Sequence, residues 1–212
     1  GTLVTEMWWP GVALSADGGT LIILHADEER LTTVDLVART TASRAVGGQQ
    51  TRLGRLLTWL LDATAGVAHA KGPMNGMTRQ VVLSPDGARL FTIGTGLETE
   101  MGENSNYSVT ETRLPVQLID VASGAIMVAS EVTGHTLRLS ADGRRVFVAE
   151  WGERWPVTRV LDAATLALLD ELDGPTVRLA PDTAGQLHLV GEQTINGGTT
   201  LSLLDAESLE TL

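Results

Sequence analysis

Residues 139–156 read LSADGRRVFVAEWGERWP. In the first half, two apolar stretches flank Ser-Ala-Asp-Gly, where the Ser and Asp side chains can bond nearby backbone N–H groups and the glycine accepts a positive φ. This pattern predicts a β-hairpin over residues 139–150. The second half, WGERWP (151–156), places two tryptophans and an arginine in the link that follows the hairpin. That link is either a plain connection between strands or the rim of a binding site.

The same hairpin pattern occurs four times along the chain. Its turns are SADG (15–18), SPDG (84–87), SADG (140–143) and APDT (180–183). Each hairpin is followed by a third apolar stretch that ends in an aspartate, and then by a fourth stretch; the aspartates are Asp35, Asp120, Asp162 and Asp205. An aspartate at a strand end accepts hydrogen bonds from the backbone of the next turn. We therefore expect four copies of a four-stranded unit, over residues 12–46, 79–132, 136–173 and 176–212.

The composition of these stretches indicates how the units pack. They are rich in Val, Leu and Ile and are often apolar on both faces, which is typical of sheets that are covered on both sides. A small four-stranded sheet that is repeated in series and buried against its neighbours is a blade of a β-propeller. The predicted fold is all-β: a propeller, or a partial propeller arc, of about four four-stranded antiparallel blades in a single domain or a segment of one (1–212).

The repeat also carries a family resemblance. The pattern VxLSPDGxRLFV…VxxIDxxSGxxxA resembles the YVTN-type β-propeller repeats of bacterial surface and periplasmic proteins. The resemblance implies a propeller fold, more blades than four, and a location in the periplasm or at the cell surface. It selects no function, because propellers host hydrolases, dehydrogenase subunits and pure binding modules.

Composition excludes several classes of protein. Of the 212 residues, 43% are hydrophobic and 19% are charged, which is typical of a globular chain, and no apolar stretch has the length of a membrane span. The formal net charge of −11 makes nucleic acid an unfavourable partner. The absence of cysteine excludes disulfides and thiolate metal sites. We find no GxSxG, HExxH or phosphate-loop motif, and expect no cofactor and no catalytic residues.

The N-terminus aligns with a later part of the chain. Residues 2–17 (TLVTEMWWPGVALSAD) match residues 167–182 (ALLDELDGPTVRLAPD) without gaps, which pairs Pro10 with Pro175. The chain is thus predicted to begin in a fourth strand. That strand either completes the last blade and closes a four-bladed ring, or belongs to a preceding blade, so that the chain is an arc of a larger propeller. We favour the arc, whose open edges or faces would take a partner.

Two insertions interrupt the repeats, at residues 47–77 and 95–114. In the first, leucines spaced as on one helix face predict a helix near 52–65 that packs on the propeller rim; they are Leu53, Leu56, Leu57, Leu60 and Leu61. Arg52 and Arg55 are too few cations for a membrane-surface helix. The second insertion is polar and acidic, and is predicted to be a solvated loop. Its Glu98, Glu100 and Glu103 are weak candidate Ca²⁺ ligands, without EF-hand spacing.

The unusual side chains are expected on one face of the propeller. In a four-stranded meander, the links from strand two to three and from strand four to the next blade lie at one end of the blades, here named the loop-rich face. The Asp-Gly and Asp turns lie at the other end. The residues expected on the loop-rich face are Trp8, Trp9, Trp59, His135, Trp151, Arg154, Trp155, and, at the ends of second strands, His25 and Glu150. Because loops on a rigid scaffold commonly carry sites and tryptophans are enriched where partners bind, this face is the candidate binding face.

Two functions agree with these features. The first is a non-catalytic protein-binding or scaffold propeller outside the cytoplasm, whose partner is another protein or the remaining blades of the same propeller. The alternative is an enzyme, or a dehydrogenase- or hydrolase-type subunit, with a site at the channel mouth on the loop-rich face. Arg138 and Arg178 lie at equivalent positions of innermost strands, where each would form an ion pair between blades or an anion site at the channel.

Overall fold

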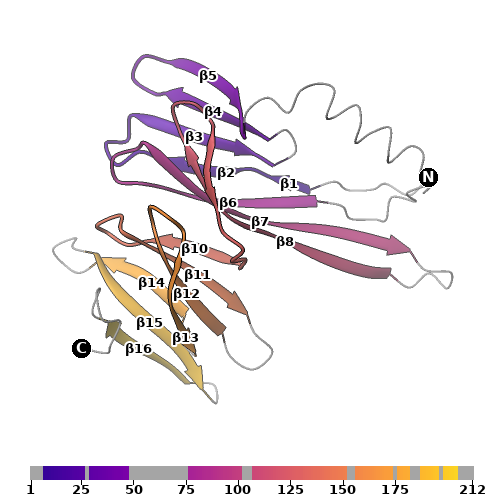
Figure 1. Cartoon of the computed structure of the whole chain (residues 1–212), viewed down its shortest axis with the longest axis vertical. Coiled ribbons are helices and arrows are strands. Elements are labelled where there is room, and N and C mark those ends of the chain that lie inside the picture. Colours follow the sequence, from indigo (N-terminus) through magenta and orange to yellow (C-terminus); the bar gives the residue numbers. More distant parts are fainter. Residues whose placement is uncertain are drawn as a thin grey trace.

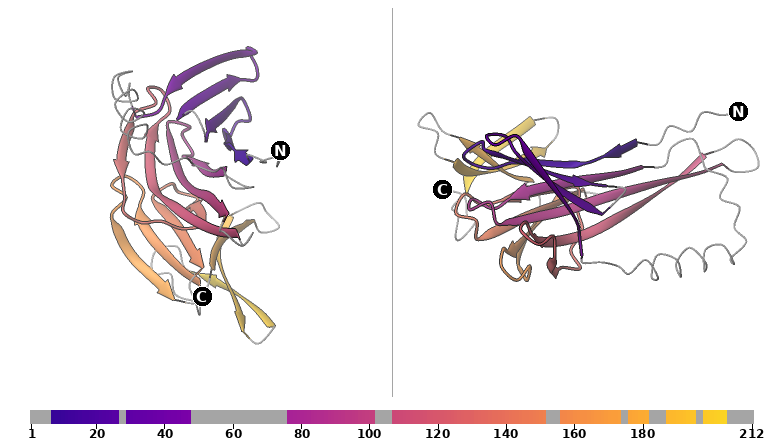
Figure 2. Two further views of the ribbon diagram at one scale, coloured as in Figure 1. Left: turned by 90° about the vertical axis from the view of Figure 1, so that its right-hand side faces the viewer. Right: turned by 90° about the horizontal axis from the view of Figure 1, so that it is seen from above.

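A computed structural model describes eight stretches of the chain: residues 7–26, 29–47, 76–101, 107–151, 156–173, 176–181, 187–195 and 198–204. Within them the protein is an arc of a β-propeller, built from antiparallel sheets that follow one another in chain order. Figures 1 and 2 show the sheets stacked from the first, in indigo, to the last, in yellow. No helix in the described stretches has the length and hydropathy needed to cross a membrane.

The first and third sheets are complete four-stranded meanders. The first holds β2 (Gly11–Leu14), β3 (Thr20–His25), β4 (Arg30–Asp35) and β5 (Thr40–Ala45). The third holds β10 (Thr136–Leu139), β11 (Arg145–Trp151), β12 (Pro156–Asp162) and β13 (Leu168–Asp173). All neighbouring strands in both sheets are antiparallel, as the repeat pattern predicts.

The second sheet has a fifth strand, and the last sheet shows three. The second holds β1 (Met7–Trp9), β6 (Gly76–Leu83), β7 (Arg89–Met101), β8 (Tyr107–Asp120) and β9 (Ile126–Ala129). The described strands of the last are β14 (Thr176–Pro181), β15 (Leu187–Ile195) and β16 (Gly198–Leu204).

The turns explain why each repeat folds as a hairpin. In the first three repeats a serine hydroxyl donates to the aspartate two residues later, and it accepts from the backbone N–H that begins the next strand. The turn glycines Gly18, Gly87 and Gly143 have φ values of 71°, 73° and 72°, which a side chain with a Cβ rarely adopts. Asp35, Asp120 and Asp162 likewise accept from backbone N–H groups two or three residues ahead; their donors are Val37, Ala38, Ser123, Ala164 and Thr165.

The core lies between sheets rather than within one. Between the first and second sheets, Ile22, Leu24 and Leu31 pack with Leu90 and Ile119. Between the second and third, the buried cluster is larger and includes Phe91, Ile93, Val116, Leu118, Leu137, Leu139, Val146, Val148 and Leu161. The third and last sheets meet through Phe147, Val160 and Leu204. Each inner sheet thus buries both faces, which is the pattern of propeller blades.

The N-terminal strand pairs differently from the sequence prediction. Residues 2–6 lie outside the described stretches, but β1 lies parallel to β6, with Met7 opposite Gly76 and Trp9 opposite Thr78. β1 therefore adds to the second sheet, and within residues 7–9 it completes no fourth strand of the last sheet. β6 is the first strand of its blade, so its other edge has no partner in the meander and can accept an added strand.

The two insertions have different outcomes. The predicted helix near 52–65 lies outside the described stretches. The loop predicted over 95–114 is wrong for residues 95–101 and 107–114, which extend β7 and β8 into a long paired hairpin that projects beyond the sheets (Figure 1). Polar residues such as Thr95 and Thr110 lie in strands here because β7 and β8 pair along their full length, out to Met101 and Tyr107, and β6 also pairs with β7 as far as Leu97.

Candidate binding face

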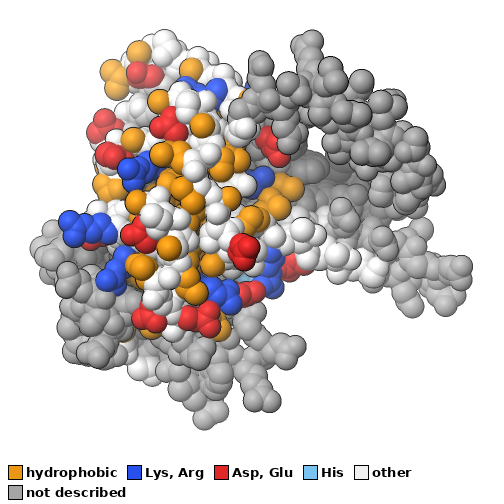
Figure 3. Space-filling model, viewed as in Figure 1, with side chains coloured by type: hydrophobic (Ala, Val, Ile, Leu, Met, Phe, Trp, Pro, Cys, Tyr) orange, Lys and Arg blue, Asp and Glu red, His pale blue; other side chains and the backbone are white. Residues whose placement is uncertain are grey.

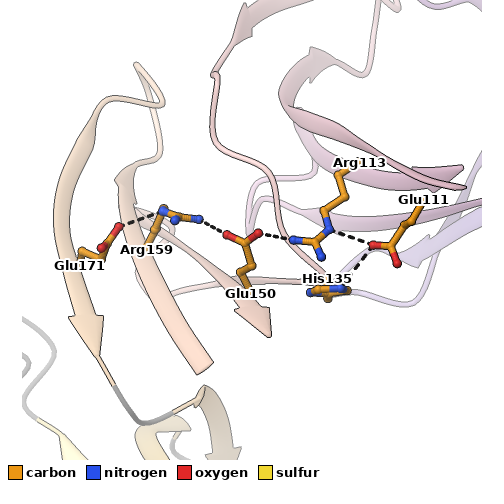
Figure 4. A network of polar contacts seen from close by, with 6 residues as sticks. All are labelled: Glu111, Arg113, His135, Glu150, Arg159 and Glu171. Carbon is orange, nitrogen blue, oxygen red and sulfur yellow. Dashed lines mark hydrogen bonds and ion pairs between the residues drawn. The ribbon is translucent and has the colours of Figure 1, made fainter. Parts of the chain in front are cut away.

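The loop-rich face carries a chain of ion pairs between the second and third sheets (Figure 4). Glu150, at the end of β11, is held between Arg113 of β8 and Arg159 of β12; its Oε2 lies 2.5 Å from the Nη1 of Arg159. Arg159 also binds Glu171 of β13, at 2.9 Å from its Nε to the carboxylate oxygen. These charges lie on the same side of β11 and β12 as the buried Val148 and Leu161, so they close the end of that core.

The network continues toward the link before β10. Arg113 Nε donates to Glu111, two residues earlier on β8, at 2.8 Å. The Nε2 of His135 lies 3.5 Å from the same carboxylate of Glu111. Two residues that the sequence predicted for this face, Glu150 and His135, are thus brought together through Glu111 and Arg113.

The ion pairs favour the charged forms of Glu150, Glu111 and Arg159. The hydrogen bond from Arg159 is the largest cause that lowers the pKa of Glu150 below its ordinary value, and the hydrogen bond from Arg113 lowers the pKa of Glu111. The bond to Glu150 in turn raises the pKa of Arg159. Each carboxylate is already engaged by a guanidinium, so neither is available as a general acid near neutral pH.

A side-chain amide joins the same two sheets next to the network. Gln80 of β6 donates from Nε2 to the carbonyl oxygen of His135 at 2.7 Å. Its Oε1 accepts from the backbone N–H of Leu137 at 3.1 Å. One amide therefore satisfies a donor and an acceptor of the chain that enters β10, in the way that a neighbouring strand would.

A cavity of about 310 Å³ lies between the first and second sheets. Its lining includes Leu24, Glu29, Arg79, Leu114, Gln117 and Ile126. Burial is the main cause that lowers the pKa of Arg79, and the charge of Glu29 raises it in part. No described residue accepts a hydrogen bond from the buried Nε of Arg79.

The predicted tryptophans are described only in part. Trp9 is 58% exposed on β1. Trp8 and Trp151 lie in β1 and β11, and their side chains are not described; Trp59, Arg154 and Trp155 lie outside the described stretches. Their gathering on one face therefore stays a prediction.

The remaining predicted residues lie apart from the network. The Nε2 of His25 is 3.1 Å from the Oγ1 of Thr32 on the neighbouring strand of the first sheet. Arg138 is exposed and donates to the carbonyl oxygen of Leu137, at 2.8 Å, whereas the ion pair between blades is formed by Arg113 and Glu150. Arg178 lies in β14, and its side chain is not described.

The weak calcium candidates do not form a described site. Glu98 and Glu100 lie on β7, opposite Thr110 and Ser108, and Glu103 lies outside the described stretches. Across the described part of the chain, no group of three or more His, Asp or Glu residues is placed to hold a metal ion.

Sequence reasoning missed Glu111, Arg113, Arg159 and Glu171. One available signal was their alternation: Glu111 and Arg113, like Arg159 and the buried Leu161, are two residues apart and so share a face of one strand. The ion pair between Arg113 and Glu150 could not be predicted from that spacing, because it depends on how far the hairpin of β7 and β8 extends.

Comparisons with known proteins support the fold and no finer identity. No family model matches the chain, and no curated protein matches it. Among solved structures, dipeptidyl peptidase 4 from Porphyromonas gingivalis is 12% identical over 93% of this chain and 31% of its own length, with a TM-score of 0.50. TolB from Acinetobacter baumannii is 13% identical over 94% of this chain and 41% of its own, with a TM-score of 0.46.

A third similar structure is a β-propeller domain by description. The Cps50 (Swd1) β-propeller domain from Myceliophteria thermophila is 12% identical over 95% of this chain and 71% of its own, with a TM-score of 0.44. At such identities the likeness concerns the fold alone. The chain spans about a third to two fifths of the length of the first two structures.

Proposed function

We propose that this chain is a non-catalytic protein-binding or scaffold unit, and that a further propeller blade covers the outward face of its first sheet. The observation that carries the proposal is an apolar sheet face that the described residues leave open. The register places Val12 and Leu14 of β2 opposite Ile23 and Leu21 of β3, on the side of the sheet away from the buried Ile22 and Leu24.

This face has the composition of a blade interface. Val12 is 54% exposed and Leu14 is 55% exposed, while Leu21, Ile23 and Val34 beside them are half-buried. In the view of Figure 1, the described surface carries hydrophobic side chains, in orange, among charged and other side chains (Figure 3). Covering half-exposed valine and leucine side chains stabilises a complex by about 1 kcal/mol each.

A further blade is the occupant that fits best. The opposite face of the same sheet already packs on the second sheet through residues of the same kind, so a blade on the outward face would repeat an existing contact. In the last sheet Leu201 and Leu203 are also exposed, at 58% and 49%. The longer length of the similar solved structures agrees with additional blades on either side.

The arrangement of charges favours this function over catalysis at the channel mouth. Glu150 and Glu111 are each bound by a guanidinium and have lowered pKa values, which suits a structural connection between blades. The YVTN-like repeat supports a location in the periplasm or at the cell surface, where we propose that the tryptophan-bearing links bind a second protein.

The test compares apolar residues on the outward face of the first sheet with an exposed apolar residue in a turn. We expect the 212-residue chain to bind a hydrophobic dye and to associate weakly and without fixed stoichiometry in sedimentation experiments. The double change Val12→Asp and Leu14→Asp should lower both signals, while circular dichroism stays unchanged. Val37→Asp, at an 85% exposed position in the turn after β4, is the matched control and should change neither.

Three results would contradict the proposal. One is a monomer without dye binding, and another is an equal loss of association in the control variant. A stable dimer of fixed stoichiometry would identify a second copy of the chain as the occupant, in place of a further blade.

A further inference from the structure

The cavity between the first and second sheets combines apolar walls with one partly buried arginine, whose Nε is buried. Leu24 of β3, Leu114 of β8 and Ile126 of β9 contribute hydrocarbon surface, and Arg79 of β6 contributes the guanidinium. Its volume of about 310 Å³ is at the lower end of cavities that hold small organic molecules.

Arg79 is held in this cavity by its position on β6. It pairs with Gly94 of β7, and a side chain at Gly94 would meet the Cδ of Arg79 at 3.1 Å, so the glycine leaves room for the arginine stem. The neighbouring Gln80 points to the third sheet, which directs Arg79 toward the first. A guanidinium in such a place is normally satisfied by acceptors, because a buried N–H without one costs about 1–3 kcal/mol.

The charge around Arg79 selects the kind of anion. Glu29, an exposed residue in the link between β3 and β4, acts on Arg79 through its charge but forms no ion pair with it at 4 Å or less among the described contacts. The charged side chains among the described residues that line the cavity are Arg79 and Glu29, and the imidazole of His25 lines it as well. This balance favours a singly charged anion over a doubly charged one, and the apolar walls favour an organic body.

We propose that this cavity binds a small organic monocarboxylate, whose carboxylate accepts hydrogen bonds from Arg79 and whose apolar body lies against Leu24, Leu114 and Ile126. Gln117 also lines the cavity and offers an amide to the same ligand. The site lies between two blades, apart from the ion pairs of the second and third sheets, and adds a small-molecule site to a unit proposed to bind proteins.

The experiment titrates the 212-residue chain with benzoate and with 4-methylpentanoate, by calorimetry at pH 7. Inorganic phosphate, which is more highly charged and has no apolar body, is the comparison anion and should bind several-fold more weakly. In the unchanged protein, the methyl resonances of Ile119 and Ile126 should shift on addition of benzoate, because both residues line the cavity. This readout requires no variant.

Three variants test the roles of the charges. Arg79→Gln should weaken benzoate binding about tenfold or more, since a hydrogen bond to a charged group contributes about 1.5–3 kcal/mol. Arg89→Gln removes the same charge from an exposed position of β7 and should leave binding unchanged. Glu29→Gln removes the competing carboxylate and should tighten binding several-fold, an effect that a purely structural role of Arg79 does not predict.

Several outcomes would overturn the proposal: no methyl shifts with benzoate, equal binding by Arg79→Gln and the unchanged protein, or phosphate binding as tight as that of benzoate. Unchanged or weaker binding in Glu29→Gln would refute a carboxylate placed at Arg79. If Arg79→Gln does not fold, Arg79→Lys keeps the positive charge but loses the two-pronged hydrogen bonding of the guanidinium, and it should show a smaller but measurable loss of affinity.

Discussion

The amide of Gln80 offers a sharp test of how one blade is joined to the next. It spans from β6 to the chain entering β10, donating to the carbonyl oxygen of His135 and accepting from the N–H of Leu137. Leu137 is fully buried. The substitution Gln80→Leu keeps nearly the same side-chain volume and removes both hydrogen bonds.

The size of the effect follows from what the substitution leaves behind. A typical hydrogen bond contributes about 0.5–1.5 kcal/mol net, and a buried donor left without an acceptor costs about 1–3 kcal/mol. The N–H of Leu137 becomes such a donor, whereas the half-buried end of the link at His135 can recruit water. We therefore expect Gln80→Leu to lower the free energy of unfolding by about 1–3 kcal/mol.

Hydrogen exchange measured residue by residue is the appropriate assay, together with chemical denaturation. The amide of Leu137 should exchange about ten- to a hundredfold faster in Gln80→Leu, because that factor corresponds to the loss of about 1.4–2.8 kcal/mol of local stability. Gln80→Glu is the matched control. It keeps an acceptor for Leu137 and loses the donor to His135, so protection of the Leu137 amide should persist.

Two results would refute this reasoning. If Gln80→Leu changes neither the unfolding free energy nor the exchange of Leu137, the amide does not join the sheets in solution. If Gln80→Glu loses the Leu137 protection as fully as Gln80→Leu does, the acceptor oxygen is not what protects that amide.

Two further predictions concern the interfaces and the effect of pH. Phe147→Ala should lower the unfolding free energy by about 3–5 kcal/mol and accelerate exchange in the last sheet more than in the first, since the Phe147 ring packs with Val160 and Leu204; equal acceleration in both sheets would contradict it. The pKa values of Glu111, Glu150, Asp86 and Asp142 are lowered in the folded protein, so their stabilising contribution is present above the unfolded carboxyl pKa of about 4 and is lost as the pH falls through the lower folded values. The melting temperature should therefore fall with acidification below about pH 4, and it should fall less in Glu150→Gln. A melting temperature that rises below about pH 4 would refute the conclusion that these carboxylates stabilise the folded protein.

Much of the local structure could be predicted because it depends on residues close in sequence. The Ser-x-Asp-Gly turns lie at the predicted positions. Asp17, Asp86 and Asp142 each accept hydrogen bonds from backbone or side-chain donors within two residues. Strand ends at Asp35, Asp120 and Asp162 formed for the same reason. The period of the hydrophobic residues then decided which side chains faced a neighbouring sheet.

The candidate site was predicted less completely. Glu150 and His135 were assigned to the loop-rich face from the topology of a meander, and the structure joins them in one network. Their partner Arg113 was missed because residues 95–114 were predicted to be a loop. Polar sequence does not distinguish a solvated loop from a paired hairpin, because the two differ in backbone pairing, which side-chain polarity does not report.

Repeat number, turn geometry and the alternation of buried and exposed positions follow from the sequence alone, because each depends on interactions within a few residues or on a fixed strand period. Only the tertiary structure decided that β1 adds to the free edge of β6, and only the packing of one sheet on another decided that Arg113 reaches Glu150 and that Arg79 and Glu29 share a cavity. These contacts join residues far apart in the chain, and their geometry depends on how neighbouring sheets lie against each other, which local pattern does not encode.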